Sequence, residues 1–192
     1  MKNWLKILSF FIENKEMKIT INSLSKKLNL NYRIAFQETK ALEKEGLVKI
    51  EKVGNSNICR FNYKLSKKVF EAEETRKNNL LKNKSLDVIY GEIEEIKDPF
   101  FIFLVFGSYA SGKQTKHSDI DFCIISNNVE TKRKAVSIVD NVPVRTHILE
   151  FSTRKFLEML ATNKDNVGKE ILKNNIILKG IESFYEIVNY AY

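Results

Sequence analysis

Residues 100–125, FFIFLVFGSYASGKQTKHSDIDFCII, constrain the fold of this chain more than any other stretch. The run FFIFLVF is continuously apolar and of strand length, which is typical of a buried strand. It ends at Gly107 and Ser108, and after a loop the chain returns as SDIDFCII. In an extended strand Asp119 and Asp121 lie on one face, and the apolar residues between and after them lie on the other. The stretch therefore predicts two core strands, the second with two carboxylates on one face.

Two carboxylates so close together repel each other, and a bound divalent cation is the simplest compensation. At Gly107 the absence of a side chain lets an anionic ligand approach the backbone. The following YASG can open a helix, whose N-terminal amides favour phosphate. The pattern therefore predicts Mg²⁺ or Mn²⁺ bound together with a nucleoside triphosphate.

The pair Gly107-Ser108, followed after ten residues by DIDF, resembles the signature of the DNA polymerase beta superfamily of nucleotidyltransferases. The form FGSYASG with SDIDF is similar to its minimal members, and the resemblance covers residues 85 to 190. It implies that Gly107 and Ser108 hold the triphosphate and that Asp119 and Asp121 are the catalytic, metal-binding residues.

The loop between the turn and the two aspartates contains Lys113 and Lys116. Their positive charge makes them candidates for binding the nucleotide phosphates. Exposed lysines without any function account for them equally well.

The superfamily's third carboxylate is expected on the strand that reads PVRTHILEF. Arg145 stands in roughly its place, and neither Thr146 nor His147 is acidic. Glu150 is a carboxylate near the far end of the strand, on the face of Thr146. The resemblance implies that the third acid helps to hold the metal that activates the attacking hydroxyl. Its loss is therefore expected to affect chemistry more than nucleotide binding.

Charge is distributed unevenly along the chain. Residues 1–84 hold 19 Lys and Arg against 9 Asp and Glu, while residues 85–192 hold 13 against 15. Such asymmetry suggests a basic nucleic-acid-binding module attached to a second domain. An AT-rich genome would also raise the lysine count, but it accounts less readily for the asymmetry.

The first half predicts three helices and a hairpin. Residues 3–13 have apolar residues at helical spacing, KIT is a short extended segment, and Asn22 or Ser23 is the expected cap of the next helix. A third helix ends at Gly46. The stretch LVKIEKVGNSNICRFNYK then alternates as a hairpin around GNSN.

This order makes a winged helix-turn-helix, and the phrase ALEKEGLV resembles the winged-helix regulators of bacteria and archaea, over residues 1–64. Ala35, Thr39 and Leu42 share the inner face of the third helix. The outer face and the wing supply the candidates for contact with double-stranded DNA: Tyr32, Arg33, Phe36, Gln37, Lys40, Lys44, Lys52 and Arg60. Alternatively, these side chains form a solvated face and the domain binds protein.

The stretch LSKKVFEAEETRKNNLLKNKS has neither Gly nor Pro and predicts a connecting helix, which is also a candidate homodimer surface. We expect an α+β chain with a winged helix-turn-helix at 1–65, a helical linker at 66–84 and a nucleotidyltransferase-fold domain, a short mixed sheet flanked by helices, at 85–192. Cys59 and Cys123 lack metal-ligand spacing and are expected to be reduced. No apolar run is long enough to span a bilayer, so a cytoplasmic chain is expected.

The rest of the second half is expected to support the sheet. Ser85 is the expected cap of a helix through Lys97, and IESFYEIVNYAY predicts an amphipathic closing helix. Its Tyr185, Tyr190 and Tyr192 are candidates for stacking on a base, although burial is the commoner use of such aromatics.

Two functions follow from these patterns. The first is an enzyme that transfers a nucleoside monophosphate from Mg²⁺-bound NTP, ATP included, to a hydroxyl of a protein, a small molecule or a nucleic acid end. The minimal members resemble the antitoxin partners of HEPN-type toxins, which modify a protein partner. The second is a DNA-binding regulator whose degenerate nucleotidyltransferase domain senses nucleotide, and Arg145 in place of an acid favours it.

Overall fold

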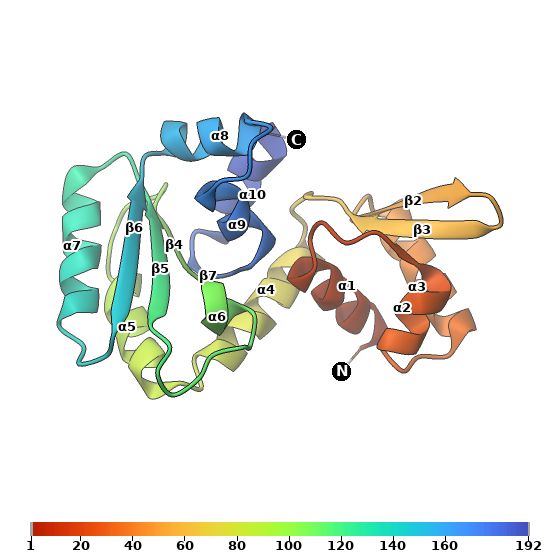
Figure 1. Ribbon diagram of the computed structural model, residues 1–192, viewed down its shortest axis with the longest axis horizontal. Helices are drawn as coiled ribbons and strands as arrows, with labels where there is room; N and C mark the ends of the chain where they lie inside the picture. Colours follow the sequence, from red (N-terminus) through yellow and green to blue (C-terminus); the bar gives the residue numbers. More distant parts are fainter. Residues whose placement is uncertain (1, 192) are drawn as a thin grey trace. The chain divides into compact units, whose positions relative to one another are not determined.

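The structure, a computed structural model, describes residues 2–191, and the chain divides into two compact units, Met1–Glu73 and Glu74–Tyr192. Both units contain helices and strands (Figure 1). No described helix is long and apolar enough to cross a membrane.

The N-terminal unit begins with three helices and a small antiparallel sheet. Its strands lie in the order β1-β3-β2, so that the third strand pairs with both others. The elements are α1 (Asn3–Glu13), β1 (Ile19–Thr20), α2 (Ile21–Lys27), α3 (Tyr32–Lys44), β2 (Val48–Val53) and β3 (Ser56–Phe61).

Apolar spacing explains how these helices pack. On α3, Ala35, Thr39 and Leu42 are buried, as the helical period predicts. The helix ends before Gly46, whose φ of +75° favours glycine. The expected cap of α2 was wrong: the hydroxyl of Thr20, rather than Asn22 or Ser23, accepts the hydrogen bond of the Ser23 amide.

The second unit contains a four-stranded sheet between helices. Helix α4 (Lys67–Leu80) crosses from the first unit into the second. The further elements are α5 (Lys84–Glu94), β4 (Ile102–Phe106), α6 (Gly107–Ala110), β5 (Ile120–Ile125), α7 (Val129–Asp140), β6 (Thr146–Phe151), α8 (Thr153–Ala161), α9 (Val167–Lys173), β7 (Asn175–Lys179) and α10 (Ile181–Ala191).

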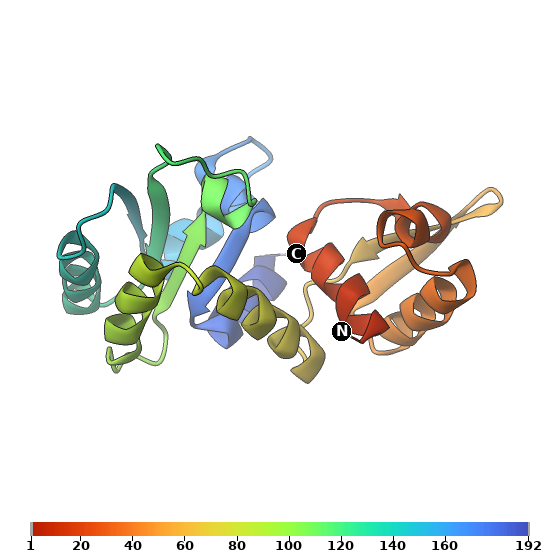
Figure 2. The ribbon, with the colours of Figure 1, turned by 90° about the horizontal axis from the view of Figure 1, so that it is seen from below.

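The sheet has the strand order β6-β5-β4-β7 and is mixed, because β5 and β6 are parallel while β4 is antiparallel to both of its neighbours. Helices α5 and α7 pack on one face, where Leu86, Phe103, Phe122 and Val139 belong to one buried cluster. Helices cover the sheet on both sides (Figure 1; Figure 2). A short mixed sheet flanked by helices is the architecture that the sequence predicted for this half.

Two local predictions in this unit were wrong. Helix α5 is capped by Asn83, whose side chain accepts from the amides of Ser85 and Leu86, and it ends at Glu94 rather than Lys97. Among the closing aromatics, Tyr185 is 1% exposed and belongs to the core, whereas Tyr190 is 85% exposed. The stacking candidate Tyr192 lies outside the described residues.

Gly180 joins β7 to α10 and provides a test of this packing. Its φ is +82°, and a Cβ there would overlap the carbonyl oxygen of Phe101. Gly180→Ala should lower the free energy of unfolding by about 1–2 kcal/mol for the left-handed backbone, and by about 1–3 kcal/mol more for the overlap. Urea denaturation followed by circular dichroism measures both contributions.

Gly112→Ala is the matched control, because Gly112 has a φ of +66° but open space around its Cβ position. It should show the backbone cost alone. Equal losses for the two variants would contradict the close approach of Gly180 to the Phe101 backbone.

Candidate functional site

The pairing of β4 with β5 places a glycine turn against an aspartate. Phe106, the last residue of β4, is opposite Asp121, so Gly107 follows directly beside the Asp121 carboxylate. Gly107 has a φ of +68°, and a Cβ there would overlap Oδ2 of Asp121. The amide group of Asn174 donates to the Gly107 carbonyl at 2.9 Å and fixes the turn from the other side. Only glycine fits between these groups.

The short helix α6 begins at this turn and is held by its own loop. The hydroxyl of Ser111 donates to the carbonyl oxygens of Gly107 and Ser108, at 3.0 and 3.1 Å. The backbone amide of Lys113 donates to the same Ser108 carbonyl at 2.9 Å. The main chain of the predicted phosphate-binding turn is therefore fixed by hydrogen bonds, while the ammonium group of Lys113 is exposed.

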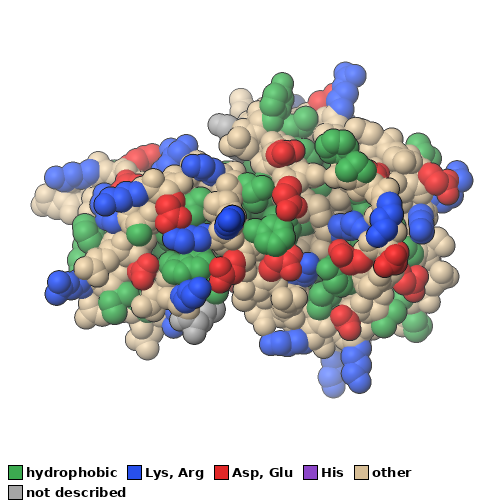
Figure 3. Space-filling view, turned by 180° about the vertical axis from the view of Figure 1, so that it is seen from behind, with side chains coloured by type: hydrophobic (Ala, Val, Ile, Leu, Met, Phe, Trp, Pro, Cys, Tyr) green, Lys and Arg blue, Asp and Glu red, His purple; other side chains and the backbone are tan. Residues whose placement is uncertain are grey.

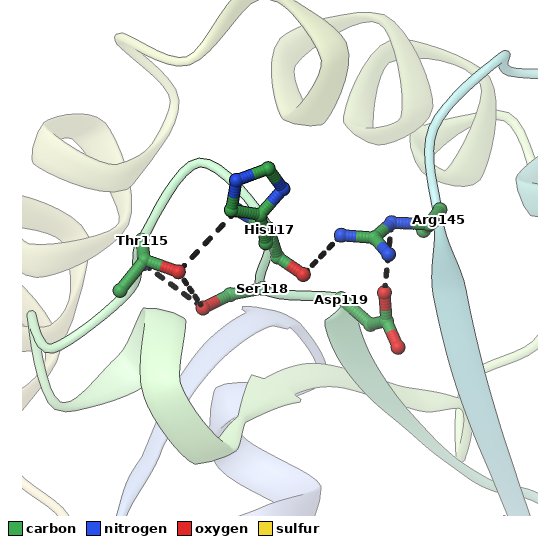
Figure 4. Close-up of polar contacts among 5 residues, drawn as sticks. All are labelled: Thr115, His117, Ser118, Asp119 and Arg145. Atoms are coloured by element: carbon green, nitrogen blue, oxygen red, sulfur yellow. Dashed lines mark hydrogen bonds and ion pairs between the residues drawn. The ribbon is translucent and has the colours of Figure 1, made fainter.

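A compact turn precedes the first aspartate (Figure 4). The Ser118 hydroxyl accepts from the Thr115 amide at 2.9 Å, and the Ser118 amide donates back to the Thr115 carbonyl at 3.2 Å. The His117 amide donates to the Thr115 hydroxyl. These bonds fix the direction in which the chain enters β5, and hence the position of Asp119.

Both aspartates lie next to basic side chains. Asp119 Oδ1 is 3.2 Å from Nε of Arg145, whose Nη2 also donates to the His117 carbonyl (Figure 4). Asp121 Oδ1 is 3.4 Å from Nδ1 of His147. The sequence predicted a cation as the compensation for two neighbouring carboxylates. In the structure, a guanidinium and an imidazole stand beside them.

The register of β6 shows which of its residues face the aspartates. Parallel pairing with β5 puts His147 opposite Asp121, whereas Arg145 precedes the strand and reaches Asp119. Glu150 is opposite Ile124, near the far end of the strand. His147, rather than Arg145, therefore occupies the position opposite the second aspartate, and Glu150 belongs to the other face.

The donor set can be tested for a metal ion. Within residues 2–191, no three or more His, Cys, Asp and Glu side chains form a group that could enclose one. Mg²⁺, however, is commonly held by one or two carboxylates together with substrate phosphates. The exposed Asp119 and the half-buried Asp121 offer two carboxylates at the start of β5, one just before the strand and one in it. The residues therefore fit a divalent cation that arrives with a nucleotide.

The cysteines supply no nucleophile to this site. Cys123 lies in the same strand as Asp121 but is fully buried, and burial raises the pKa of its thiol. Burial likewise raises the pKa of Cys59 in the N-terminal unit to about 11. Both thiols are free and stay protonated at neutral pH.

The DNA-contact candidates of the N-terminal unit differ in their surroundings. Lys40 pairs with Glu43 at 2.7 Å, and Arg60 pairs with Glu51 at 2.9 Å, so two of the expected cations are already partnered. Those that are exposed are Tyr32, Arg33, Gln37, Lys44 and Lys52, while Phe36 is half-buried with its ring 6.2 Å from that of Tyr32. On the face of the molecule in Figure 3, acidic side chains lie among the basic ones.

Residues 94–177 match the family model of the nucleotidyltransferase domain. The match runs from the end of α5 into β7, and it includes the glycine turn and both aspartates. It supports a nucleotidyltransferase domain in the second unit and does not extend to the N-terminal unit. No curated protein and no solved structure matches the chain.

Two residues at the candidate site were missed by the sequence analysis. The sequence analysis mentioned His147 only as a residue that is not acidic. It did not place His147 opposite Asp121, because the register between two parallel strands cannot be read from one sequence. Asn174 lies at the end of α9 and reaches Gly107 across 67 positions of the chain. No periodicity or motif indicates such a contact.

A double-mutant cycle tests whether the Asp119–Arg145 pair is structural. Both side chains are more than half exposed, at 53% and 63%. Exposed ion pairs contribute about 0–1 kcal/mol. Asp119→Asn, Arg145→Gln and the double variant should therefore show a coupling energy below about 1 kcal/mol in urea denaturation. A larger coupling would make Asp119 a structural partner of Arg145 and would count against a role in metal binding.

Proposed function

We propose that the second unit transfers a nucleoside monophosphate from a Mg²⁺- or Mn²⁺-bound nucleoside triphosphate to an acceptor hydroxyl. One observation carries the proposal: the turn at Gly107, which follows the last residue of β4, lies directly against Asp121 near the start of β5. In this proposal the backbone amides at Gly107 and Ser108 receive phosphate oxygens close to the two carboxylates. The match of residues 94–177 to the nucleotidyltransferase domain supports the same reaction class.

In the proposed reaction the acceptor oxygen forms a bond to the α-phosphorus of the nucleotide. The bond from that phosphorus to the oxygen bridging the α- and β-phosphates breaks, pyrophosphate leaves with the electron pair, and the hydroxyl proton passes to solvent. A divalent cation, when bound, supplies charge neutralisation at the phosphates. Asp119 and Asp121 hold it, while the backbone at Gly107 and Ser108 receives the triphosphate, with Lys113 as a further cation. Lys116, the other lysine that the sequence suggested for this role, lines a separate cavity.

An assay for label transfer tests this function. The full chain is incubated with α-labelled NTP, Mg²⁺ or Mn²⁺ and cell extract, and labelled products are separated by size. Transfer should fall by at least about 100-fold in Asp119→Asn and Asp121→Asn, because each removes one of the two carboxylates.

Glu150→Gln is the matched control, since it removes a carboxylate of β6 that lies opposite Ile124 instead of Asp121. It should retain transfer. Equal transfer by the wild type and the two aspartate variants would contradict the assignment of the site.

A second candidate is a nucleotide-sensing regulator that lacks transfer. The observation that favours it is that Arg145 and His147, both basic, stand beside the two aspartates. This version predicts binding of NTP that depends on metal, without pyrophosphate release. It also predicts DNA affinity that changes when nucleotide is present.

For the N-terminal unit we propose a winged helix-turn-helix that binds double-stranded DNA. The order helix, strand, helix, helix and hairpin supports it, as does the positive charge of residues 1–84. In this arrangement α3 enters the major groove and the β2–β3 hairpin flanks it. The tyrosine and arginine at the start of α3, Tyr32 and Arg33, are exposed and available for such contact.

The salt dependence of DNA affinity tests this interface. Arg33→Ala and Lys44→Ala should each lower the slope of log affinity against log salt by about one, if each loses one phosphate contact. Lys18→Ala, an exposed lysine outside α3 and the hairpin, is the control and should leave the slope unchanged. Slopes that are unaffected by the α3 variants would move the interface elsewhere or indicate a protein partner.

A further inference from the structure

A cavity in the second unit includes Arg145, the residue that pairs with Asp119. Its volume is about 230 Å³, and it is lined by the start of α5, by α6, and by the segments that lead into β5 and β6. The lining residues are Asn83, Ser85, Tyr109, Lys116, Ser118, Ile120, Val144 and Arg145. Ile120 and Val144 belong to the face of the sheet that α5 covers, so most of this cavity lies on the opposite side of the sheet from Asp121. It is therefore distinct from the turn at Gly107 and Ser108, neither of which lines it.

The lining of this cavity has two cations and no acid. Lys116 makes no ion pair with any described residue, and Arg145 is bound at one side by Asp119. Ser85 and Tyr109 add hydroxyl groups. The Ser118 hydroxyl already contacts Thr115, and the Asn83 carbonyl oxygen is already used by the amides of α5. Two cations with hydroxyl groups match the oxygen atoms of a phosphate group.

The volume limits the size of the occupant. Pockets for drug-sized ligands usually measure about 300–1,000 Å³. A cavity of about 230 Å³ suits a smaller molecule, such as a phosphate with one sugar. We propose that this cavity binds a small phosphate monoester, whose phosphate contacts Lys116 and Arg145.

Binding there is linked to the aspartates through Arg145. Arg145 lines the cavity, and its guanidinium contacts Asp119 at 3.2 Å and donates to the His117 carbonyl. Because that ion pair is more than half exposed, it contributes at most about 1 kcal/mol, so an anion in the cavity can compete for the guanidinium. An anion that draws Arg145 away leaves Asp119 free for a divalent cation. The phosphate ester and the metal should therefore bind cooperatively, and the effect must be reciprocal. This cooperativity rests on the proposed function, because it needs Asp119 to bind the metal. Binding of the ester in the cavity does not rest on it.

Calorimetric titration of the full chain, without nucleotide or metal and at constant ionic strength, tests the cavity. The probes are ribose 5-phosphate, inorganic phosphate and ribose. Ribose 5-phosphate should bind and ribose should not. If inorganic phosphate binds as tightly as ribose 5-phosphate, the cavity recognises the free phosphate anion and not the ester. Lys116→Ala should weaken binding about tenfold, because a charge-assisted hydrogen bond is lost. Lys134→Ala, an exposed lysine of α7 outside the cavity, should not change it.

Absence of ribose 5-phosphate binding, or binding that Lys116→Ala and Arg145→Gln leave unchanged, would overturn the cavity assignment. This result does not depend on any transfer activity, so it is separable from a failure of the proposed function.

The coupling is measured separately, from free Mn²⁺ by electron paramagnetic resonance, with and without ribose 5-phosphate. Wild type should bind Mn²⁺ at least threefold more tightly with the ester present, and Arg145→Gln should bind it equally well in both conditions. Ribose 5-phosphate itself binds some Mn²⁺. The same titration of Asp121→Asn, which lacks one of the two proposed metal ligands, measures that amount. Equal Mn²⁺ affinities of the wild type in both conditions would overturn the competition for Arg145.

Discussion

The register of β5 between its two neighbours is the constraint on which the site depends. Pairing with β4 puts Asp121 beside the Gly107 turn, and pairing with β6 puts His147 opposite the same aspartate. The apolar residues of β5 enforce this register, because Ile120, Phe122 and Ile124 are buried under α5 and α7. A slip by one residue would turn the carboxylates into that core. The packing of the sheet and the position of the aspartates are therefore determined by the same alternation.

The neighbouring bases change what the carboxylates are expected to do. Two aspartates with no partner would repel each other and would gain from any cation. Here the Arg145 guanidinium offsets part of the charge of Asp119, and the His147 imidazole lies against Asp121, so a metal must displace or share these contacts. Since the pair with Arg145 is exposed, the cost of breaking it is small. In the proposed function, nucleotide phosphates would offset this cost by completing the coordination of the metal. The same geometry is compatible with catalysis or with sensing, and the two differ in whether pyrophosphate is released.

Much of the fold followed from the sequence, because its strongest signals are local. The apolar run before Gly107, the alternation around Asp119 and Asp121 and the glycine stop after α3 each depend on neighbouring residues. The features that the sequence did not predict depend on contacts between residues far apart in the chain or on a choice among neighbouring polar residues. The capping roles of Thr20 and Asn83 were missed because several polar residues stood within one turn of each helix start. The place of His147 could not be predicted, because the register between parallel strands is set by packing across 26 positions of the chain.

The central claim is that Asp119 and Asp121 bind the metal of a nucleotide seated at the Gly107 turn. Anomalous diffraction tests it most directly, from crystals of the full chain grown with Mn²⁺ and a triphosphate analogue that cannot be cleaved between the α- and β-phosphates. The account predicts a manganese peak between Asp119 and Asp121, the triphosphate at Gly107 and Ser108, and the Arg145 guanidinium displaced from Asp119. A nucleotide bound elsewhere, with no manganese at the aspartates and the Asp119–Arg145 pair intact, would contradict it.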